Sequence, residues 1–410
     1  MSRVERRRVL TVFGTRPEAI KLAPVVKKLE ASPGFESVVC VTGQHRQMLD
    51  QVLRAFDIHP HHDLDIMRPN QDLFDVTVAV LRGMKGVLQT VEPHMVLVQG
   101  DTTTAFAASL AAFYSRIPVG HVEAGLRTYN KYSPFPEEVN RCMTSAIADL
   151  HFAPTEWAAR NLAKEGIPED KVFITGNTVV DALIEALSII EKGADLGDLE
   201  KAMSFPMKER QIILITGHRR ESFGEGFRSI CRAIRRLVEA FPNYNFVYPV
   251  HLNPNVRKPV DDILNQTRLP NIHLIEPLGY LPFVYLMKHA HLILTDSGGI
   301  QEEALTFRKP VLVMRDTTER PEGVESGGIR LVGHCEESIF GECSRLLVSK
   351  SAYEAMVVSK NPYGDGRAAE RIVTILEKVL ATPVTSPIPI RSHLQTTPMV
   401  KDDVKSSTRA

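Results

Sequence analysis

Short apolar runs rich in β-branched residues alternate with amphipathic stretches along most of the chain. In the first half these runs are RRVLTVFG, SVVCVTG, MVLVQG, IPVGHVEAG, DLHFAP and VFITG. A second series follows, consisting of QIILITGH, NFVYPVH, NIHLIEP, HLILTDSGG and PVLVMRD. Runs of this length between helical patterns are typical of buried strands. The pattern therefore predicts the α/β class, with doubly wound parallel sheets.

The helical stretch VVDALIEALSIIEKGADLGDLEKAM separates the two series. We therefore predict two Rossmann-like domains, the first over residues 1–177 and the second over 178–365. The helical pattern at 366–380 follows the last predicted strand, and we expect it to pack back on the first domain. Residues 382–410 are rich in Pro, Ser and Thr without periodicity, which predicts a disordered tail.

Composition excludes several classes of protein. The chain has 410 residues, 43% of them hydrophobic and 24% charged, so it is globular and long enough for two cores. Its 49 basic and 49 acidic residues cancel, so we expect neither nucleic acid nor a membrane surface as a partner. The five cysteines lack metal or disulfide spacing, and no run resembles a signal peptide or a membrane span. A cytoplasmic protein without a metal site is predicted.

The segment TDSGGIQEEA, residues 295–304, ends a predicted strand and opens a predicted helix. The first N–H groups of a helix have no intrahelical partner, and glycine lets an anion approach them closely. Ser297 and Gly298 could therefore bind phosphate. Equally, Ser297 could be an ordinary N-cap followed by turn residues.

Other polar residues also cluster at the predicted strand ends, where open α/β sheets bind ligands. They are Arg16, Lys21, Asp101, Glu123, Glu137, Arg141, His218, Arg219, Arg220, Arg315 and Arg320. Several have a plain structural interpretation. Glu137 and Arg141 have the i,i+4 spacing of a surface ion pair, and Asp101 could be a helix cap. Lys21 could be a solvated helix residue, and His218 a buried, hydrogen-bonded histidine.

Two common cofactor motifs are missing from the sequence. There is no Gly-x-Gly-x-x-Gly after a strand and no Gly-x-x-x-x-Gly-Lys-Ser/Thr. Neither a nicotinamide dinucleotide nor a nucleoside triphosphate loop is indicated. We predict that the protein needs no cofactor.

Eight segments together resemble one family: FGTRPEAIK, QGDTTT, GHVEAGLRT, YSPFPEEVNR, TGHRRESFGEGF, LTDSGGIQEEA, RDTTERPEG and NPYGDGRAAERI. They are similar to the signature segments of bacterial non-hydrolysing UDP-N-acetylglucosamine 2-epimerases, in the same order, over residues 7–380. This resemblance implies a GT-B-like architecture, in which two Rossmann-like domains face a central cleft. It also implies a homodimer.

The resemblance also implies roles for individual residues. The acid/base group would be Asp101, Glu123, Glu137 and His218. The substrate would be held by Arg16, Lys21, Arg141, Phe283, Ser297, Gly298, Glu303 and Arg320. In this set Glu303 would hold the ribose hydroxyls, and Phe283 would lie near the uracil.

The implied activity is the reversible epimerisation of UDP-N-acetylglucosamine (UDP-GlcNAc) to UDP-N-acetylmannosamine (UDP-ManNAc). UDP would leave from the anomeric carbon, 2-acetamidoglucal would form, and UDP would add back, with the product supplying cell-surface polysaccharide synthesis. Two alternative activities, which use related chemistry, stay open. A hydrolysing epimerase would release N-acetylmannosamine and UDP, and a GT-B glycosyltransferase would share the nucleotide site.

Some family members bind a second UDP-GlcNAc as an activator. The residues that match this site are Gln44, Gln47, Gln71 and His251. Asn70 stands where those members have an arginine, and asparagine cannot grip a phosphate with two charge-assisted bonds. Arg68 either substitutes for that arginine or points to solvent. We expect an activator site that is present but weakened.

Overall fold

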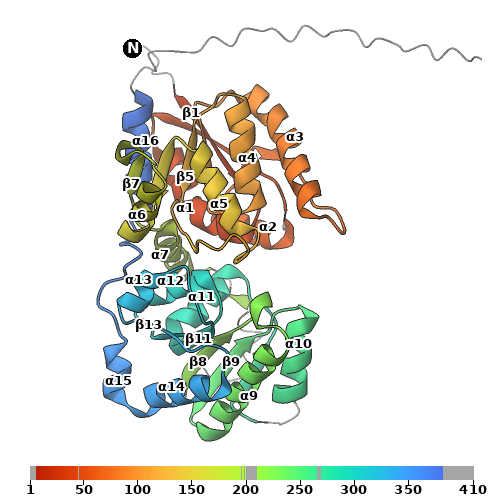
Figure 1. Ribbon diagram of the computed structural model, residues 1–410, viewed down its shortest axis with the longest axis vertical. Coiled ribbons are helices and arrows are strands. Elements are labelled where there is room, and N and C mark those ends of the chain that lie inside the picture. Colours follow the sequence, from red (N-terminus) through yellow and green to blue (C-terminus); the bar gives the residue numbers. More distant parts are fainter. Residues whose placement is uncertain are drawn as a thin grey trace, which may run out of the picture.

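The two predicted α/β domains are present and lie one above the other, as Figure 1 shows. The computed structural model describes residues 6–381, except 45, 195, 198, 200–209, 266–268 and the side chains of Gln47 and Arg220. Each domain contains one parallel sheet with helices on both faces. The predicted tail, 382–410, lies outside the described residues.

The first sheet has the strand order β3-β2-β1-β4-β5-β6-β7, with every pair parallel. Its strands are β1 (Arg7–Phe13), β2 (Phe35–Val41), β3 (His62–Asp63), β4 (Met95–Gln99), β5 (Val119–Val122), β6 (Leu150–Ala153) and β7 (Val172–Ile174). Its helices are α1 (Arg16–Ala31), α2 (Arg46–Ala55), α3 (Leu73–Val91), α4 (Thr103–Tyr114), α5 (Glu137–Ile147), α6 (Glu156–Lys164), the 3-10 turn η1 (Glu169–Lys171) and α7 (Thr178–Glu191).

The second sheet has the order β10-β9-β8-β11-β12-β13 and is also parallel throughout. Its strands are β8 (Gln211–Thr216), β9 (Tyr244–Pro249), β10 (Ile272–Ile275), β11 (Ala290–Thr295), β12 (Val311–Val313) and β13 (Ile329–Leu331). The helical segments here are η2 (Arg220–Ser222), α9 (Glu225–Ala240), α10 (Pro254–Val260), the π-helical turn η3 (Asp261–Asn265), α11 (Tyr280–His289), α12 (Gly298–Thr306), α13 (Pro321–Glu325), α14 (Glu336–Val348) and α15 (Lys350–Ala355). The last helix, α16 (Ala368–Ala381), returns to the first domain.

Alternation along the central strands divides each domain into two core layers. In β1, Val9 and Phe13 pack with α1, α2, α7 and α16, whereas Leu10 and Val12 pack with α3 and α4 on the other face. In the second sheet one face of β8 packs with α9, α10 and α14, and the other packs with α11 and α12. Because successive strand residues point to opposite faces, near-continuous apolar runs are needed to fill both layers.

Two neighbouring chain segments connect the domains. Asn177 N–H donates to the carbonyl of Tyr363 at 2.7 Å, and Gly176 and Gly364 lie against each other with positive φ angles of 86° and 139°. Helix α7 contributes to the cores of both domains, and α16 packs on α1 and α7. Glycine suits this crossing because L side chains rarely adopt positive φ.

The predicted α/β class is confirmed, but the sequence prediction missed β3 and β13. Strand β3 has only two residues, His62 and Asp63, so it offers no apolar run, and β13 has only three. The predicted helical stretch over 179–203 is interrupted, because α7 ends at Glu191 and Gly193 has a φ of 91°, and its last residues, 200–203, lie outside the described residues.

Each sheet reverses its strand order at one place, between β1 and β4 and between β8 and β11. Ligands of open α/β sheets bind beyond the carboxyl ends of the strands at such switch points. The loops there begin at Gly14 and Gly100 in the first domain, and at Gly217 and Asp296 in the second. Three of the predicted site residues, Asp101, His218 and Ser297, lie in these loops, and Arg16 and Gly298 begin the helices that follow two of them.

Candidate active site

Glu18 ties the two loops of the first switch point together. Its carboxylate accepts hydrogen bonds from the N–H groups of Gly14 (3.0 Å) and Thr15 (2.8 Å), and from the hydroxyl of Thr102 (2.7 Å). Thr15 and Glu18 form the capping box that begins α1. Burial raises the pKa of Glu18, and the hydrogen bonds oppose this shift. The position of Arg16, the first residue of α1, is thereby fixed.

Asp101 lies in the second of these loops and is paired with Arg141. The Arg141 Nη2 atom is 2.6 Å from Asp101 Oδ2, and the Asn140 amide donates to the Asp101 carbonyl at 3.0 Å. The helix-cap interpretation of Asp101 is wrong, because Thr102 is the N-cap of α4 and accepts from the N–H of Ala105. The Asp101 carboxylate therefore does not cap α4 but pairs with Arg141 beside the loop.

Glu137, the first residue of α5, has an unpaired carboxylate oxygen. Its Oε2 atom is buried and makes no hydrogen bond within the described residues. Burial raises the pKa of Glu137 and Asp101 adds to this, whereas Arg141 and Arg219 lower it. The ion pairs of Arg141 go to Asp101 and, at 3.4 Å, to Glu138. The interpretation of Glu137 as one half of a surface ion pair is therefore not supported.

Lys21 and Glu123 form a buried ion pair behind these residues. Lys21 Nζ and the Gln99 amide both donate to Glu123 Oε2. Lys21 is 8% exposed, so its interpretation as a solvated residue is wrong. Glu123 follows β5 with a φ of 64°, an uncommon conformation that turns the chain sharply at the strand end.

Arg320 brings the second domain into contact with this pair. Its Nη2 atom lies 3.5 Å from Glu123 Oε1, and its Nε atom donates to Glu302 Oε1 at 2.6 Å. Nη1 donates to Glu319, which also accepts from Arg315 at 3.0 Å. Lys21 and Arg320 thus both have carboxylate partners in this structure.

The Ser-Gly-Gly turn begins α12 beside Arg320. Ser297 is at the N-cap position, but its side chain makes no capping hydrogen bond. A Cβ atom at Gly298 would lie 2.6 Å from Arg320 Nη1 and 2.9 Å from Glu319 Oε1. Glycine is needed here for close packing of the cation against the helix start. A helix N-terminus next to a guanidinium favours an anion.

One turn further along α12, Glu303 faces α11 and the first domain. Its Oε1 atom accepts a hydrogen bond from the Tyr280 hydroxyl at 3.3 Å. Burial raises the pKa of Glu303 to about 7, Glu302 contributes to the rise, and Arg16 opposes it. Arg16 therefore lies close to Glu303 although the two come from different domains. Phe283, on α11, is half-buried against the second-domain core.

His218 lies at the second switch point. Its side chain is 42% exposed, which does not fit a deeply buried histidine. Its Nδ1 atom is 3.5 Å from Asp296 Oδ1, and its ring stacks on His251 with centroids 5.3 Å apart and planes 14° apart. Partial burial lowers the pKa of His218, and the neighbouring His251, Arg219 and Arg16 lower it further.

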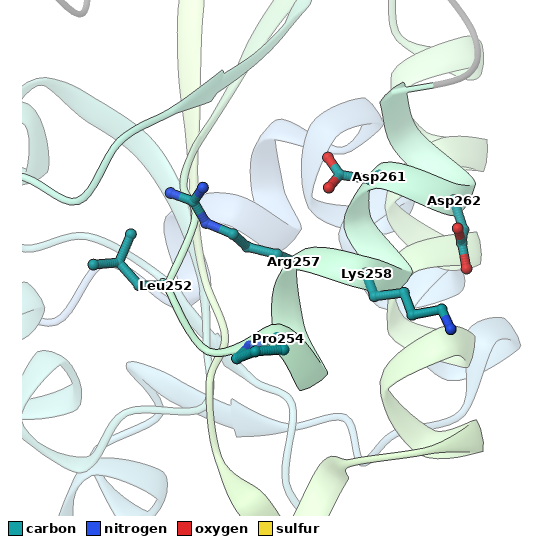
Figure 2. A pocket seen from close by; sticks show the side chains of 6 residues that line it. All are labelled: Leu252, Pro254, Arg257, Lys258, Asp261 and Asp262. Carbon is teal, nitrogen blue, oxygen red and sulfur yellow. The ribbon is translucent and has the colours of Figure 1, made fainter.

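A separate hollow, shown in Figure 2, lies along α10. It is lined by Leu252, Pro254, Arg257, Lys258, Asp261 and Asp262. All of them come from one segment of the chain, and Arg257 is paired with Glu276. Among the described residues, no three His, Cys, Asp or Glu side chains are arranged to hold a metal ion. Within the same residues, no helix is long and apolar enough to cross a bilayer.

Known proteins of one kind match this chain over most of its length. The sequence profile of a family described as UDP-N-acetylglucosamine 2-epimerase matches residues 27–377. The UDP-N-acetylglucosamine 2-epimerase of Escherichia coli strain K12 is 55% identical over 372 residues, which is 90% of this chain and 98% of the relative. The chain belongs to the UDP-N-acetylglucosamine 2-epimerase family. The resemblance inferred from the eight segments is therefore confirmed.

Solved structures agree on both the family and the fold. The crystal structure of UDP-GlcNAc 2-epimerase from Neisseria meningitidis, bound to UDP-GlcNAc, is 53% identical. Its TM-score is 0.86, covering 90% of this chain and 100% of that chain. Acinetobacter baumannii MurG is 13% identical with a TM-score of 0.55, covering 91% of this chain and 99% of that chain. This second likeness concerns the fold alone, and with the two parallel sheets it confirms the GT-B-like class.

The loop before α3 contains Gln71, one of the residues that members of this epimerase family are expected to use for an activator. Hydrogen bonds within the loop hold it together. The Gln71 side chain accepts from Arg68 N–H at 2.8 Å and donates to the Ile66 carbonyl at 2.7 Å. Asn70 has a φ of 59°, a conformation that asparagine adopts more readily than arginine. Gln44 accepts from the Thr104 hydroxyl at 3.1 Å. The Gln47 side chain lies outside the described residues.

Arg68 is exposed to solvent and is hydrogen-bonded within its own loop. Its guanidinium donates to the carbonyls of Asp65 (2.8 Å) and Met67 (2.7 Å) in its own loop. The guanidinium is thus held within this loop.

The sequence analysis missed several residues that hold this epimerase-family site together. They are Glu18, Gln99, Asp296, Glu302 and Glu319. The Thr-x-x-Glu spacing of the capping box was a usable signal for Glu18. Glu302 had none, because its partners Asn177 and Arg320 are distant in sequence.

Proposed function

We propose that this protein is a non-hydrolysing epimerase that interconverts UDP-GlcNAc and UDP-ManNAc without a cofactor. The observation that carries the proposal is the unpaired, buried carboxylate oxygen of Glu137, next to Asp101 and Arg141. Burial raises the pKa of this carboxyl, which makes the carboxylate a stronger base for a proton-transfer step. The family and its ligand-bound relative supply the substrate class.

The chemistry explains why several acid/base groups are needed. The C–H bond at carbon two of the sugar is not acidic while UDP remains attached. As the bond from the anomeric carbon to UDP lengthens, positive charge develops on the sugar ring and the adjacent C–H acidifies. Removal of that proton gives 2-acetamidoglucal. Re-addition of UDP with protonation from the opposite face inverts carbon two, which calls for proton-transfer groups on both faces.

We assign these roles to Asp101, Glu123, Glu137 and His218. Glu137 and Asp101 lie together in the first domain, and Arg219, next to His218, acts electrostatically on Glu137 from the second domain. This proximity supports a reaction centre between the two switch points. Glu123 is buried further inside, where it is already paired with Lys21.

The departing diphosphate requires positive charge. We propose that the N-terminus of α12, with Ser297 and Gly298, binds it together with Lys21, Arg16 and Arg320. Arg141 also has a buried Nε atom without a hydrogen bond among the described residues. Lys21 and Arg320 both pair with Glu123, so this carboxylate positions the two cations that would meet the diphosphate. Glu303 would hold the ribose, with Phe283 near the uracil.

Product analysis distinguishes this proposal from the alternatives. Purified protein is incubated with UDP-GlcNAc alone and the products are followed by NMR. We expect an equilibrium mixture of the two UDP-sugars, reached from either side. Free N-acetylmannosamine and UDP in equal amounts would instead identify a hydrolysing enzyme. Turnover only after an acceptor is added would identify a glycosyltransferase.

We also propose a second, weakened UDP-GlcNAc site at Gln44, Gln47, Gln71 and His251. The stacking of His251 on His218 supports a coupling between this site and the reaction centre. Progress curves from UDP-ManNAc should then show a lag that a trace of UDP-GlcNAc removes. Curves without a lag, unchanged by the trace, would contradict the activator. We propose finally that the product supplies a cell-surface polysaccharide.

A further inference from the structure

Asp296 lies between the two loops of the second switch point, and its side chain is fully buried. It follows β11 directly and precedes Ser297, and its N–H donates to the carbonyl of Thr216 in β8 at 3.3 Å. A buried carboxylate normally needs a cation or several donors around it. Within the described residues, His218 is the one basic side chain whose nitrogen lies within 4 Å of this carboxylate.

The two carboxylate oxygens have different surroundings. Oδ2 accepts the backbone N–H groups of His218 at 2.7 Å and Arg219 at 2.8 Å, so it fixes the course of the loop after β8. Oδ1 is buried, makes no hydrogen bond within the described residues and lies 3.5 Å from His218 Nδ1. One oxygen therefore holds the backbone of His218, and the other faces its ring.

The remaining neighbours of the ring oppose its protonation. Burial lowers the pKa of His218, and the charges of His251, Arg219 and Arg16 lower it further. Asp296 is the neighbour that raises this pKa. A proton-transfer group works best when its pKa lies near the working pH, and the Asp296 carboxylate partly offsets the lowering of the His218 pKa.

We propose that Asp296 is the positioning residue for His218, holding the proton on Nδ1 so that Nε2 is free to exchange a proton with the substrate. This inference rests on the proposed acid/base role of His218. A neutral imidazole carries one N–H, and the acceptor beside one nitrogen decides which tautomer is present. A carboxylate in this position also stabilises the imidazolium that forms during proton transfer.

The Asp296→Asn variant tests the role in turnover. Its amide can still accept the loop N–H groups through oxygen, but its NH2 group would face Nδ1 and place the ring proton on Nε2. We expect kcat to fall roughly tenfold or more while KM changes by less than about threefold. The limb of the pH profile that belongs to His218 should move to lower pH. This holds whether His218 acts as acid or base, because loss of the carboxylate lowers its pKa.

Tyr248→Phe is the matched control. The Tyr248 hydroxyl donates to the carbonyl of Gly217 at 3.0 Å, so it holds the same loop without carrying charge. This variant should keep the wild-type pH profile, with kcat within about threefold of wild type. An equal shift of the pH limb in both variants would reduce Asp296 to a structural residue and overturn the proposal.

Nitrogen NMR of histidine-labelled protein gives a readout independent of turnover. We expect the Nδ1–H tautomer of His218 in the wild type, and a lower pKa with the Nε2–H tautomer in Asp296→Asn. The Nε2–H tautomer in the wild type, or an unchanged pKa in the folded variant, would overturn the proposal. If the variant fails to fold, the wild-type tautomer alone decides. A wild type without epimerase activity would refute the proposed function, but the tautomer would still be measured.

Discussion

At the residue scale, the account depends most on Glu137, the carboxylate with an unpaired buried oxygen. Glu137→Gln keeps the size of the side chain but removes its ability to take a proton. We expect turnover to fall by roughly a hundredfold or more, because acid/base groups commonly contribute factors of that order. Melting temperature should not fall, since Oε2 has no hydrogen bond to lose. Steady-state kinetics with UDP-GlcNAc measure the effect, and wild-type turnover would remove Glu137 from the mechanism.

Asp101 makes a second test of the same kind. Asp101→Asn removes the charge that pairs with Arg141 at 2.6 Å. The variant should therefore lose a proton-transfer group and hold the Arg141 guanidinium less firmly in place. We expect a fall in turnover of roughly a hundredfold or more. The Glu165→Gln variant, which removes the charge that pairs with Arg127 but leaves the Asp101–Arg141 pair in place, is the control and should keep its turnover. An equal loss in both variants would mean that the effect is structural.

Glu303 gives a residue-scale prediction about pH and stability. Burial raises its pKa from the ordinary 4.5 to about 7, so the folded chain holds this proton more tightly than the unfolded chain. The resulting stabilisation is complete below the unfolded-state pKa and is lost as pH rises through 7. Glu303→Gln should therefore gain on the order of 1–3 kcal/mol relative to wild type at pH 8, and little at pH 4.5. Chemical denaturation at both pH values tests this; a difference independent of pH would contradict it.

At the scale of elements, the start of α12 offers a matched pair of glycines. Gly298→Ala would place a carbon 2.6 Å from Arg320 Nη1, whereas Gly299→Ala meets no atom within 4 Å. We expect Gly298→Ala to lose about 1–3 kcal/mol of unfolding free energy, because the buried ion pair must move. Gly299→Ala should be neutral or gain up to about 1 kcal/mol from helix propensity. Thermal and denaturant unfolding provide the comparison; equal stabilities would show that Arg320 does not pack on this turn.

The elements also show how far the sequence alone could lead. The long apolar runs predicted the strands of both sheets. The rule that ligands bind at strand ends identified Arg16, Asp101, His218 and Ser297 as candidate site residues. Short strands such as β3 lack an apolar run, so the hydrophobic pattern could not reveal them. Ion pairs between distant segments could not be predicted either, because the spacing of residues along the sequence does not show which distant segments meet.

The two adjacent glutamates of α12 illustrate the same limit. They point in different directions, since neighbouring helix residues are about 100° apart. Glu302 pairs with Arg320 and Asn177, while Glu303 faces Tyr280. Only the folded chain distinguishes the two.

At the scale of the whole molecule, we propose a homodimer, as the family resemblance implies. Apolar side chains are exposed on α3, α4 and α5, and these helices pack side by side in the order α3, α4, α5. Phe113 and Tyr114 at the end of α4 are 60% and 71% exposed. Such patches mark interfaces more often than free surface. Phe113→Glu should therefore convert a dimer into a monomer.

Analytical ultracentrifugation measures this directly. Val348→Glu is the control, because Val348 is 78% exposed but lies on α14 in the other domain. It should sediment like the wild type. A monomeric wild type, or a dimer unaffected by Phe113→Glu, would contradict an interface on these helices.

The central claim is that carbon two is inverted through loss and return of its proton. The most direct test is to run the reaction in heavy water and to follow carbon two of both UDP-sugars by NMR. We predict that deuterium enters carbon two of UDP-ManNAc as it forms, because the glucal intermediate is reprotonated from a group that exchanges with solvent. Epimer formed without deuterium at carbon two would contradict the elimination mechanism.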